Sequence, residues 1–339
     1  MTAPPADLVT ADLVHTLQAH WRLDVRQLDY LAVGFGAHHW QATTSTGARY
    51  FLALHELGYP GSDLDARTAV FGQLQQALGA ARWLETSAAL DFVVGPLPDV
   101  WRTSCRRIAD RFALSVYPWL DAAPMRRLDD RRTAVVLAGL HAVVPRLPPG
   151  LGRTEDFRIP HRARLEDALM DLDHTWRTGP YAEPARDQLG RHRDGVRALF
   201  DFYDAEAAWA RGSSRDWVLT HGEPFGPNLL QCVDGRLQLV DWDSLLIAPR
   251  ERDLWELPPD GPAWAAYREL VQAPIDERRL RLYRAWYDLA ETAVYIALFR
   301  SPHLADQNAA TSWDNFLVFL PTRARWPGVV AENGSIRTG

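Results

Sequence analysis

Short runs of alternating apolar and polar residues occupy the first part of the chain, which is the pattern of half-buried strands. These runs are Leu28–Val33, His39–Thr44 and Arg49–His55, and the connections between them contain glycine, as hairpin connections commonly do. Further strands are predicted at Asp91–Val94 and Phe112–Tyr117. The pattern therefore predicts a small antiparallel sheet.

Apolar residues at helical spacing predict two helices in the same part of the chain. One is short and covers residues 8–20. The other begins at Ser62, where Ser62 and Asp65 form a start that is similar to a capping box, and it continues to about Ala81. We expect this second helix to cross the sheet.

Beyond Pro118 the helical spacing of apolar residues dominates. Helices are predicted over residues 130–144, 162–176, 184–210, 262–273 and 276–300. The segment Trp217–Asp243 is an exception and is predicted to form two or three short strands. We therefore expect an α+β protein with a small N-terminal β lobe, residues 1–117, and a larger, mainly helical C-terminal lobe, residues 118–330, joined by a hinge near residues 117–121.

Composition limits the classes of partner. The chain has 339 residues and a net charge of −6, so it has no overall basic surface, and we expect neither nucleic acid nor a membrane as a partner. The two cysteines, Cys105 and Cys232, are too few for a disulfide framework, which predicts a reducing, cytoplasmic location. No apolar run approaches the roughly 18 residues that a spanning helix needs, and the N-terminus lacks the layout of a signal peptide.

The chain contains no lysine, so all 37 basic residues are arginine. A codon bias of the genome is the simplest cause of this composition. Whatever its cause, the composition excludes a Walker P-loop, whose lysine contacts nucleotide phosphates, and it excludes Schiff-base chemistry.

The densest group of chemically useful residues lies in residues 218–243. Asp234-Gly235 is flanked there by apolar-rich runs, which predicts a two-residue type I′ hairpin turn. Counting outward from that turn places Asn228 opposite Asp241, with Cβ atoms about 4.5–5.5 Å apart. An amide oxygen and a carboxylate at one point suit a Mg²⁺ ion held between the protein and nucleotide phosphates.

A second carboxylate can reach the same space. Glu223 lies five residues before Asn228, on a turn held by Gly222 and Pro224. Phosphoryl transfer uses a metal ion to neutralise the phosphates and a carboxylate to orient the attacking hydroxyl. Each of these pieces alone is usually an ordinary loop or a solvated turn, but their joint occurrence around one hairpin favours a functional site.

These residues resemble the central motif of the aminoglycoside phosphotransferase family, whose members are related to choline kinases and, more remotely, to protein kinases. That motif is His-Gly-Asp-x-x-x-x-Asn, followed by an apolar strand, Asp-[Phe/Trp]-[Asp/Glu] and a later Asp-Leu pair, met here by Asp253-Leu254. The resemblance covers about residues 25–300 and implies a two-lobed, protein-kinase-like fold. It implies the following roles: catalytic base, Glu223; bracing of the catalytic loop, His221 and Asp253; and metal ligation, Asn228, Asp241 and Asp243.

The resemblance also implies a nucleotide site for ATP or GTP in the N-terminal lobe. Backbone groups around Tyr117 and Trp119, in the hinge segment, would bind the base. The turn from Gly34 to Gly36 would cover the phosphates, although His39 replaces the third glycine of the usual pattern.

Two positions depart from the family pattern. Position 223 is glutamate where most members have aspartate, and Ala53 occupies the place of the lysine that pairs with the phosphates. His55, on the same face of the predicted strand, and Arg67, on the following helix, are the nearest candidates to replace that lysine. A surface histidine and a solvated helix face are the ordinary alternatives for these two residues. The glutamate that should pair with the lysine is absent from residues 63–84.

We therefore expect a kinase that transfers the γ-phosphate to a hydroxyl of an aminoglycoside-like antibiotic, as in antibiotic resistance, or of a related metabolite. The alternatives are a kinase of an amino alcohol or sugar, and a kinase-fold binding protein with impaired catalysis. The small-molecule acceptor would be the main partner, and the chain would be a monomer or a homodimer. The acceptor could meet acidic side chains or tryptophans, which are otherwise solvated or part of the core: Glu166, Asp167, Asp171, Asp173, Asp288, Glu291, Trp264, Trp286 and Trp313.

Overall fold

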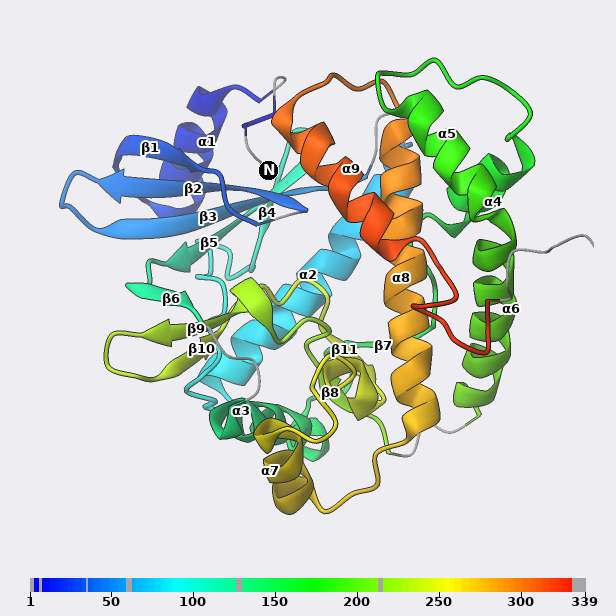
Figure 1. Ribbon diagram of the computed structural model, residues 1–339. Coiled ribbons are helices and arrows are strands. Elements are labelled where there is room, and N and C mark those ends of the chain that lie inside the picture. The colour runs from blue at the N-terminus through cyan, green and yellow to red at the C-terminus, as the bar shows by residue number, and fades with distance from the viewer. Residues whose placement is uncertain are drawn as a thin grey trace, which may run out of the picture. The chain divides into compact units, whose positions relative to one another are not determined.

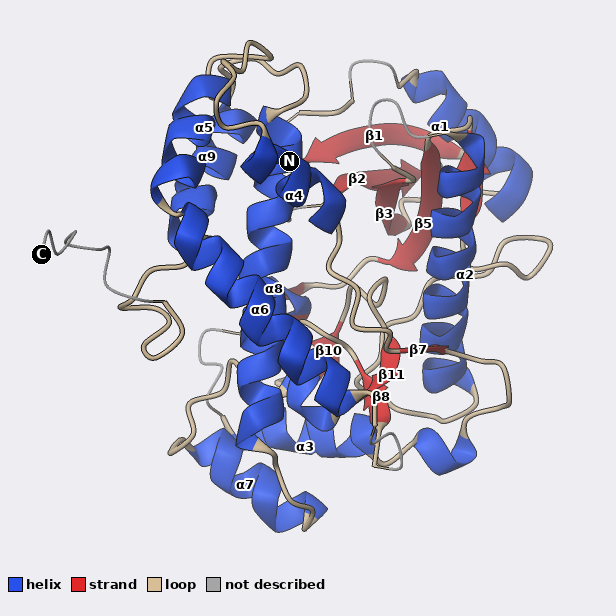
Figure 2. Ribbon diagram, turned by 90° about the vertical axis from the view of Figure 1, so that its right-hand side faces the viewer, coloured by secondary structure: helices blue, strands red, loops and turns tan. Residues whose placement is uncertain are grey.

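The structure is a computed structural model that describes residues 3–5, 8–34, 36–58, 63–125, 130–212 and 216–330 (Figures 1 and 2). It divides into two compact units. The first unit contains Met1–Glu155 and Asp216–Ile275, and the second contains Asp156–Arg215 and Asp276–Gly339. The predicted division into functional lobes at residue 117 stays a prediction.

An antiparallel sheet in the order β1-β2-β3-β5-β4 lies in the N-terminal part of the first unit (Figure 1). Its strands are β1 (Val25–Leu31), β2 (Ala37–Thr44), β3 (Arg49–Glu56), β4 (Arg106–Ile108) and β5 (Phe112–Pro118). All but β4 were expected from the alternating pattern, and β4 escapes it because three residues are too few to show a period of two.

The two faces of this sheet differ in character because side chains alternate along each strand. One face packs against Leu13 of α1 (Thr10–Thr16) and Leu17 of the following π-helical turn (Leu17–Trp21). This face is apolar and includes Trp40, Leu52, Leu54, Leu114 and Val116. Cross-strand pairing places Ala53 beside Ser115 on the opposite face, and this second face is the one that matters for the candidate site.

Helix α2 (Leu64–Thr86) lies between β3 and β4 in the chain. Its first turn is capped by Asp63, whose side chain accepts a hydrogen bond from the backbone N–H of Ala66 at 2.7 Å. The predicted cap, Ser62, lies outside the described residues. The buried side of α2 carries Leu74, Leu78 and Leu84, which pack into the large apolar cluster described below.

The remainder of the first unit combines helices with short strands. Helices α3 (Arg131–His141) and α7 (Pro262–Val271) pack against each other. The short strands are β6 (Ala122–Pro124), β7 (Arg153–Thr154), β8 (Val218–Thr220), β9 (Leu229–Cys232), β10 (Leu237–Leu239) and β11 (Leu246–Ala248), in the orders β10-β9-β6 and β7-β11-β8. In the predicted strand Asp91–Val94, Val93 makes only an isolated bridge to Leu239.

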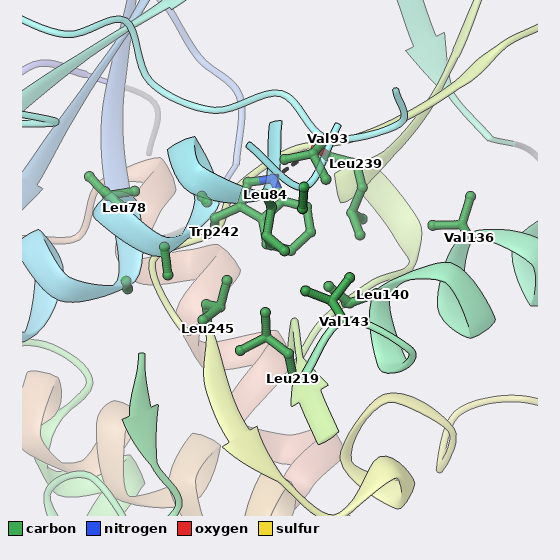
Figure 3. Close-up of a cluster of buried hydrophobic side chains, with 14 of the residues drawn as sticks. Leu78, Leu84, Val93, Val136, Leu140, Val143, Leu219, Leu239, Trp242 and Leu245 are labelled. Carbon is green, nitrogen blue, oxygen red and sulfur yellow. Dashed lines mark hydrogen bonds between the residues drawn. The ribbon is translucent and has the colours of Figure 1, made fainter. Parts of the chain in front are cut away.

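A large apolar cluster fixes the segment that carries the candidate site (Figure 3). Trp242 is fully buried in it together with Leu239 and Leu245, and Figure 3 shows the side chains of Leu84 and Val93 beside Leu239 and Trp242. Burying one such side chain contributes roughly 1.5–3 kcal/mol. The polar residues Asp241 and Asp243 therefore alternate with side chains that anchor their backbone to a rigid core.

The second unit is helical (Figure 1). It contains α4 (Arg162–Met170), α5 (Ala182–Arg191), α6 (Arg193–Ala210), α8 (Glu277–Phe299) and α9 (Gln307–Phe319), and α8 packs against α4, α6 and α9. The predicted helix over residues 184–210 is broken at His192 into α5 and α6. Helix α9 was not predicted. The α+β class is confirmed, and within the described ranges no helix is both long and apolar enough to cross a membrane.

Candidate active site

The loop after β8 is held by a buried carboxylate. Asp253, which ends the 3₁₀ turn Arg250–Asp253, is fully buried. Its carboxylate accepts hydrogen bonds from the backbone N–H groups of His221 at 2.9 Å and Gly222 at 2.6 Å. The third contact is with Nε2 of His141 at 3.2 Å. Burial opposes the charge, but the hydrogen bond and charge of His141 and the charge of Arg252 keep the pKa of Asp253 below its usual value.

His221 links this loop to the strand that precedes Asp241. Its Nε2 lies 2.8 Å from the carbonyl oxygen of Val240, to which it must donate. Its Nδ1 therefore accepts the backbone N–H of Glu223 at 3.3 Å. Burial lowers the pKa of His221 to about 4, so the ring is neutral at neutral pH. The contacts of His221 and Asp253 suit the bracing role that the resemblance implied for them.

The hairpin of β9 and β10 differs from the prediction by one residue. Leu239 pairs with Leu229 and Leu237 with Gln231, and the loop has three residues instead of two. Among the described residues Gly235 has φ +85° and Asp234 is not in the left-handed region, so a type I turn followed by a left-handed glycine replaces the type I′ turn. The Asp234 carboxylate accepts the backbone N–H of Arg236 at 3.1 Å, which favours this turn.

The predicted pairing of Asn228 with Asp241 is therefore wrong. The backbone N–H of Val240 donates to the carbonyl of Asn228 at 3.0 Å, and Asp241 is the next residue, with φ +65°. This left-handed backbone turns the chain immediately after the hairpin. Asn228 is thus paired with Val240, and Asp241 follows Val240 at the open end of the hairpin. A backbone turn, not a strand pair, brings Asp241 to this position.

Three carboxylates in this region lie close enough for their charges to affect one another's pKa. The charge of Glu223 acts on Asp241, and the charges of both act on Asp243. Desolvation and the charge of Glu223 raise the pKa of Asp241 to about 6, and desolvation and the two neighbouring charges raise that of Asp243. Desolvation also raises the pKa of Glu223, against the charge of Arg252. The side chain of Asp243 is nevertheless 43% exposed, so a ligand can reach it.

These groups fit a magnesium ion that is shared with a ligand. Within the described part of the chain, no three His, Cys, Asp or Glu side chains are arranged to hold a metal ion by themselves. The amide nitrogen of Asn228 donates to the carbonyl of Glu223 at 3.0 Å, which leaves the amide oxygen out of this bond. Two aspartates and an amide oxygen are hard ligands, and Mg²⁺ commonly completes its octahedron with water and phosphate oxygens. The mutual repulsion of the carboxylates would be relieved by a divalent cation.

An apolar cluster on the second face of the sheet includes the residue that precedes Asp241. Ala53, Val94 and Tyr117 form a cluster with Val240, the residue before Asp241. Phe51 and Leu120 pack against the same cluster. Burial raises the pKa of Tyr117, and the charges of Asp241 and Asp243 act in the same direction, so its phenol lies near the carboxylates. An apolar cluster near these carboxylates is the kind of lining that suits a nucleotide base.

The other predicted nucleotide residues differ in what they contact. Trp119 donates its indole N–H to Asp121 at 3.1 Å and lies against the guanidinium of Arg49, so these two neighbours engage its side chain. Arg67 is partly buried, and its Nε atom has no hydrogen-bond partner among the described residues. No described contact joins Arg67 to His55.

The turn before β2 needs its glycines. Gly34 and Gly36 have φ values of +70° and +92°, and Phe35 between them lies outside the described residues. The ring nitrogen Nδ1 of His39 lies 2.9 Å from the carbonyl of Val33. His39, which occupies the place of the third glycine, thus braces the turn. The role of this turn over the phosphates stays a prediction.

His55 is the predicted residue that the structure brings to the carboxylates. It is 7% exposed, on the same sheet face as Ala53, and its Nδ1 lies 3.7 Å from Oδ2 of Asp243. Its Nε2 lies 3.1 Å from Oγ of Ser115 on β5. Burial lowers the pKa of His55 to about 4. The alternative of a surface histidine is therefore wrong.

Arg252 is a site residue that the sequence did not reveal. Its buried guanidinium donates to Thr220 Oγ1 at 3.0 Å and to the carbonyl of Ser244 at 2.8 Å, so it joins the loops that carry Glu223 and Asp243. Its position immediately before Asp253 was the available signal, but an arginine beside an aspartate is common on exposed turns.

Most side chains considered for the acceptor are engaged by their own neighbours. Glu166 pairs with Arg162 at 2.8 Å, and Asp171 pairs with Arg300 at 2.7 Å. Asp288 is fully buried and binds Arg325. The tryptophans are similar: Trp264 is buried, Trp286 donates to the carbonyl of Arg158, and Trp313 packs against Tyr181, Phe299 and Phe316.

Comparison with known proteins gives the family and the fold. The model of the phosphotransferase enzyme family APH matches residues 27–295. The chain is similar in structure to spectinomycin phosphotransferase APH(9)-Ia in complex with ADP and spectinomycin, with a TM-score of 0.70, 17% identity and coverage of 91% of this chain and 93% of that chain.

Two further solved structures show the same fold. Amicoumacin kinase hAmiN, in complex with AMP-PNP, Ca²⁺ and Ami, has a TM-score of 0.56 at 15% identity and covers 91% of each chain. Choline kinase LicA from Streptococcus pneumoniae has a TM-score of 0.53 at 13% identity, covering 92% of this chain and 98% of that chain. The predicted two-lobed, kinase-like fold is thus confirmed, and because the family model matches most of its length, the chain belongs to the phosphotransferase enzyme family APH.

Proposed function

We propose that this protein is a magnesium-dependent kinase that transfers the γ-phosphate of ATP or GTP to a hydroxyl group of a small molecule. The observation that supports this most strongly is that the charges of Glu223, Asp241 and Asp243 act on one another while the side chain of Asp243 is accessible. Family membership supports a phosphotransferase. Structures of the similar spectinomycin phosphotransferase contain ADP or AMP, which supports a nucleotide as the phosphate donor.

The carboxylates divide into two roles in this proposal. Asn228, Asp241 and Asp243 would hold Mg²⁺, which neutralises charge on the phosphates when bound. Glu223 would accept a hydrogen bond from the acceptor hydroxyl and take its proton as the oxygen attacks the γ-phosphorus. The bond between that phosphorus and the β–γ bridging oxygen breaks, and the nucleoside diphosphate leaves. The raised pKa of Glu223 suits a general base because it brings the proton affinity closer to that of a group working at neutral pH.

Loop bracing completes the site. Asp253 fixes the backbone of His221 and Gly222 with two hydrogen bonds, so Glu223 begins from a defined position. Glutamate is one methylene longer than the usual aspartate, and the fixed backbone therefore determines where its carboxylate reaches. This arrangement would position the base without contact between Asp253 and the reacting atoms.

The acceptor is proposed at the level of its class. An aminoglycoside-like antibiotic is the first candidate, in line with the antibiotic kinases to which the fold is similar. The pairing of Glu166, Asp171 and Asp288 with arginines favours a second candidate. The arginines already neutralise these acids, which reduces their attraction for a polycation. An amino alcohol or sugar of low charge is therefore the alternative acceptor.

Nucleotide consumption with a panel of antibiotics, sugars and amino alcohols would test the proposal. We expect turnover with at least one acceptor in the wild type, and a loss of about 10²–10⁴-fold in Glu223→Gln with nucleotide binding retained. Asp260→Asn, which removes an exposed carboxylate of the same unit, is the matched control and should keep full activity. Equal turnover of Glu223→Gln and wild type would contradict the assignment of the base. Nucleotide binding without magnesium and without turnover would favour a kinase-fold binding protein.

A further inference from the structure

Strand β3 offers the nucleotide no cation at the expected place. Ala53 is 5% exposed and packs with Val94 and Tyr117, so its surroundings are apolar. The chain has no lysine that could replace it. The next residue on the same face is His55, two positions along the strand.

The side chain of His55 has room to extend from the sheet toward the loop that carries Asp243. Its cross-strand neighbours on the two sides are Ala37 on β2 and Ala113 on β5. Both are small, so the imidazole is not crowded by its neighbours in the sheet. A histidine between two alanines can thus direct its ring away from the sheet, toward the segment that carries Asp243.

The two ring nitrogens have different partners. Nε2 lies 3.1 Å from the hydroxyl oxygen of Ser115, which is fully buried. Nδ1 faces Oδ2 of Asp243 at 3.7 Å. The Ser115 hydroxyl is also placed to donate to the carbonyl of Ala53 at 3.4 Å, a longer contact than the one with the ring. A neutral imidazole has one N–H and one acceptor nitrogen. The N–H is on Nδ1 when the Ser115 hydroxyl donates to Nε2, and on Nε2 when that hydroxyl donates to Ala53.

We propose, resting on the kinase function proposed above, that His55 is a positioning residue: oriented by Ser115, it directs its Nδ1–H at Asp243 and holds that carboxylate at the cation site. In a chain without the lysine, this contact gives β3 a polar connection to the loop that carries Asp243. The affinity for nucleotide then depends on the metal ion, whose ligand Asp243 is held from above by a residue that does not touch the metal.

Calorimetric titration with ADP at a series of Mg²⁺ concentrations tests this without any acceptor. We expect His55→Ala to need about tenfold more Mg²⁺ for half-maximal ADP binding, in the range usual for residues that orient metal ligands. Ser115→Ala should also raise the Mg²⁺ concentration needed for half-maximal ADP binding, by a smaller factor. His38→Gln is the matched control, because His38 is a buried histidine of the same sheet that pairs with Leu54 on the opposite face. It should keep the wild-type dependence on Mg²⁺.

Two conservative variants separate positioning from simple packing. Asparagine places a polar atom near the site of Nδ1, and glutamine places one near that of Nε2. His55→Asn should therefore retain most of the wild-type affinity for Mg²⁺ and ADP, while His55→Gln should lose it. The reverse order would overturn the proposal, because it would show that the bond to Ser115 alone matters. Thermal melting of each variant without ligand identifies any variant that fails to fold.

The outcomes distinguish this inference from the function on which it rests. If wild type binds ADP with Mg²⁺ and His55→Ala binds it with the same metal dependence, the role of His55 is wrong and the kinase proposal stands. If wild type binds no nucleotide at any Mg²⁺ concentration, the kinase proposal fails and the inference fails with it. A shifted Mg²⁺ dependence in His55→Ala, rescued by His55→Asn, supports both.

Discussion

Gly222 lies directly against the guanidinium of Arg252: a Cβ atom at position 222 would be 2.4 Å from Nη2. Arg252 cannot give way easily, because it is bonded to Thr220 and Ser244 on either side. The backbone of Gly222 also has φ +103°, a conformation that residues with a side chain rarely adopt. Two separate features therefore require glycine at position 222: the positive φ of its backbone and the close approach of the Arg252 guanidinium.

We expect Gly222→Ala to reduce the free energy of unfolding by more than 3 kcal/mol, since it adds a clash with a buried charged group to the backbone strain. Gly226→Ala is the matched control in the same loop, with φ +57° and no atom within 4 Å of the new Cβ. The control should lose only about 1–2 kcal/mol. Urea unfolding of the two variants measures the difference, and equal losses would show that Arg252 moves aside.

Asp241→Asn should raise the thermal stability of the protein without ligand at pH 8. Desolvation and the charge of Glu223 raise the pKa of Asp241 to about 6, so above that pH its charge is unfavourable in the folded state. Asparagine tolerates the left-handed backbone at φ +65° and adds no strain. The same substitution should abolish the rise in melting temperature that Mg²⁺ with ADP produces in wild type. Differential scanning calorimetry with and without these ligands tests both effects. A melting temperature of the ligand-free variant below that of ligand-free wild type would contradict the predicted gain in stability.

The sequence names residues for the candidate site, and their roles stay predictions, but it does not give the geometry of the site. The order of residue types from His221 to Asp253 indicates phosphoryl-transfer chemistry because few other sites need an amide and several carboxylates at these spacings. The register of the hairpin was not predictable in the same way. Asp-Gly fits a two-residue turn and a three-residue turn, and the hydrogen bonds of Asp234 to Arg236 decide between them only in the folded structure.

Other features depend on contacts between distant segments. The strand β4 has three residues, and α9 becomes recognisable as an element only by its packing on α8. The contact of His55 with Asp243 joins positions far apart in the sequence. A single sequence shows that His55 shares a face with Ala53, but it does not show what lies opposite that face.

Asp288 tests whether the acids of the second unit recognise the acceptor or support the fold. It is fully buried and accepts hydrogen bonds from Arg325 and from the indole of Trp326. Asp288→Asn should therefore lower the free energy of unfolding by about 3 kcal/mol, since it leaves a half-buried guanidinium without its charge partner. The KM for the acceptor should stay at the wild-type value at a temperature where the variant is folded. A large increase in KM with unchanged stability would instead assign Asp288 to acceptor binding.

Two buried histidines make stability depend on pH. Burial lowers the pKa of His55 and His221 to about 4, whereas a histidine in an unfolded chain titrates near 6.5. As the pH falls through 6.5 the unfolded chain binds protons that the folded protein does not bind, so stability decreases until about pH 4. Each of these histidines should lower the free energy of unfolding by about 2 kcal/mol between pH 7 and pH 5.

His55→Gln isolates one of these contributions. The raised pKa values of Asp241 and Asp243 act in the opposite direction, since these groups bind protons more readily in the folded state, but they are present in both proteins. The change in unfolding free energy from pH 7 to pH 5 should therefore be about 2 kcal/mol smaller in His55→Gln than in wild type. Urea unfolding at the two pH values gives this difference. An identical pH dependence in the two proteins would mean that His55 titrates in the folded state much as it does in the unfolded chain, so that the folded structure does not exclude its protonated form.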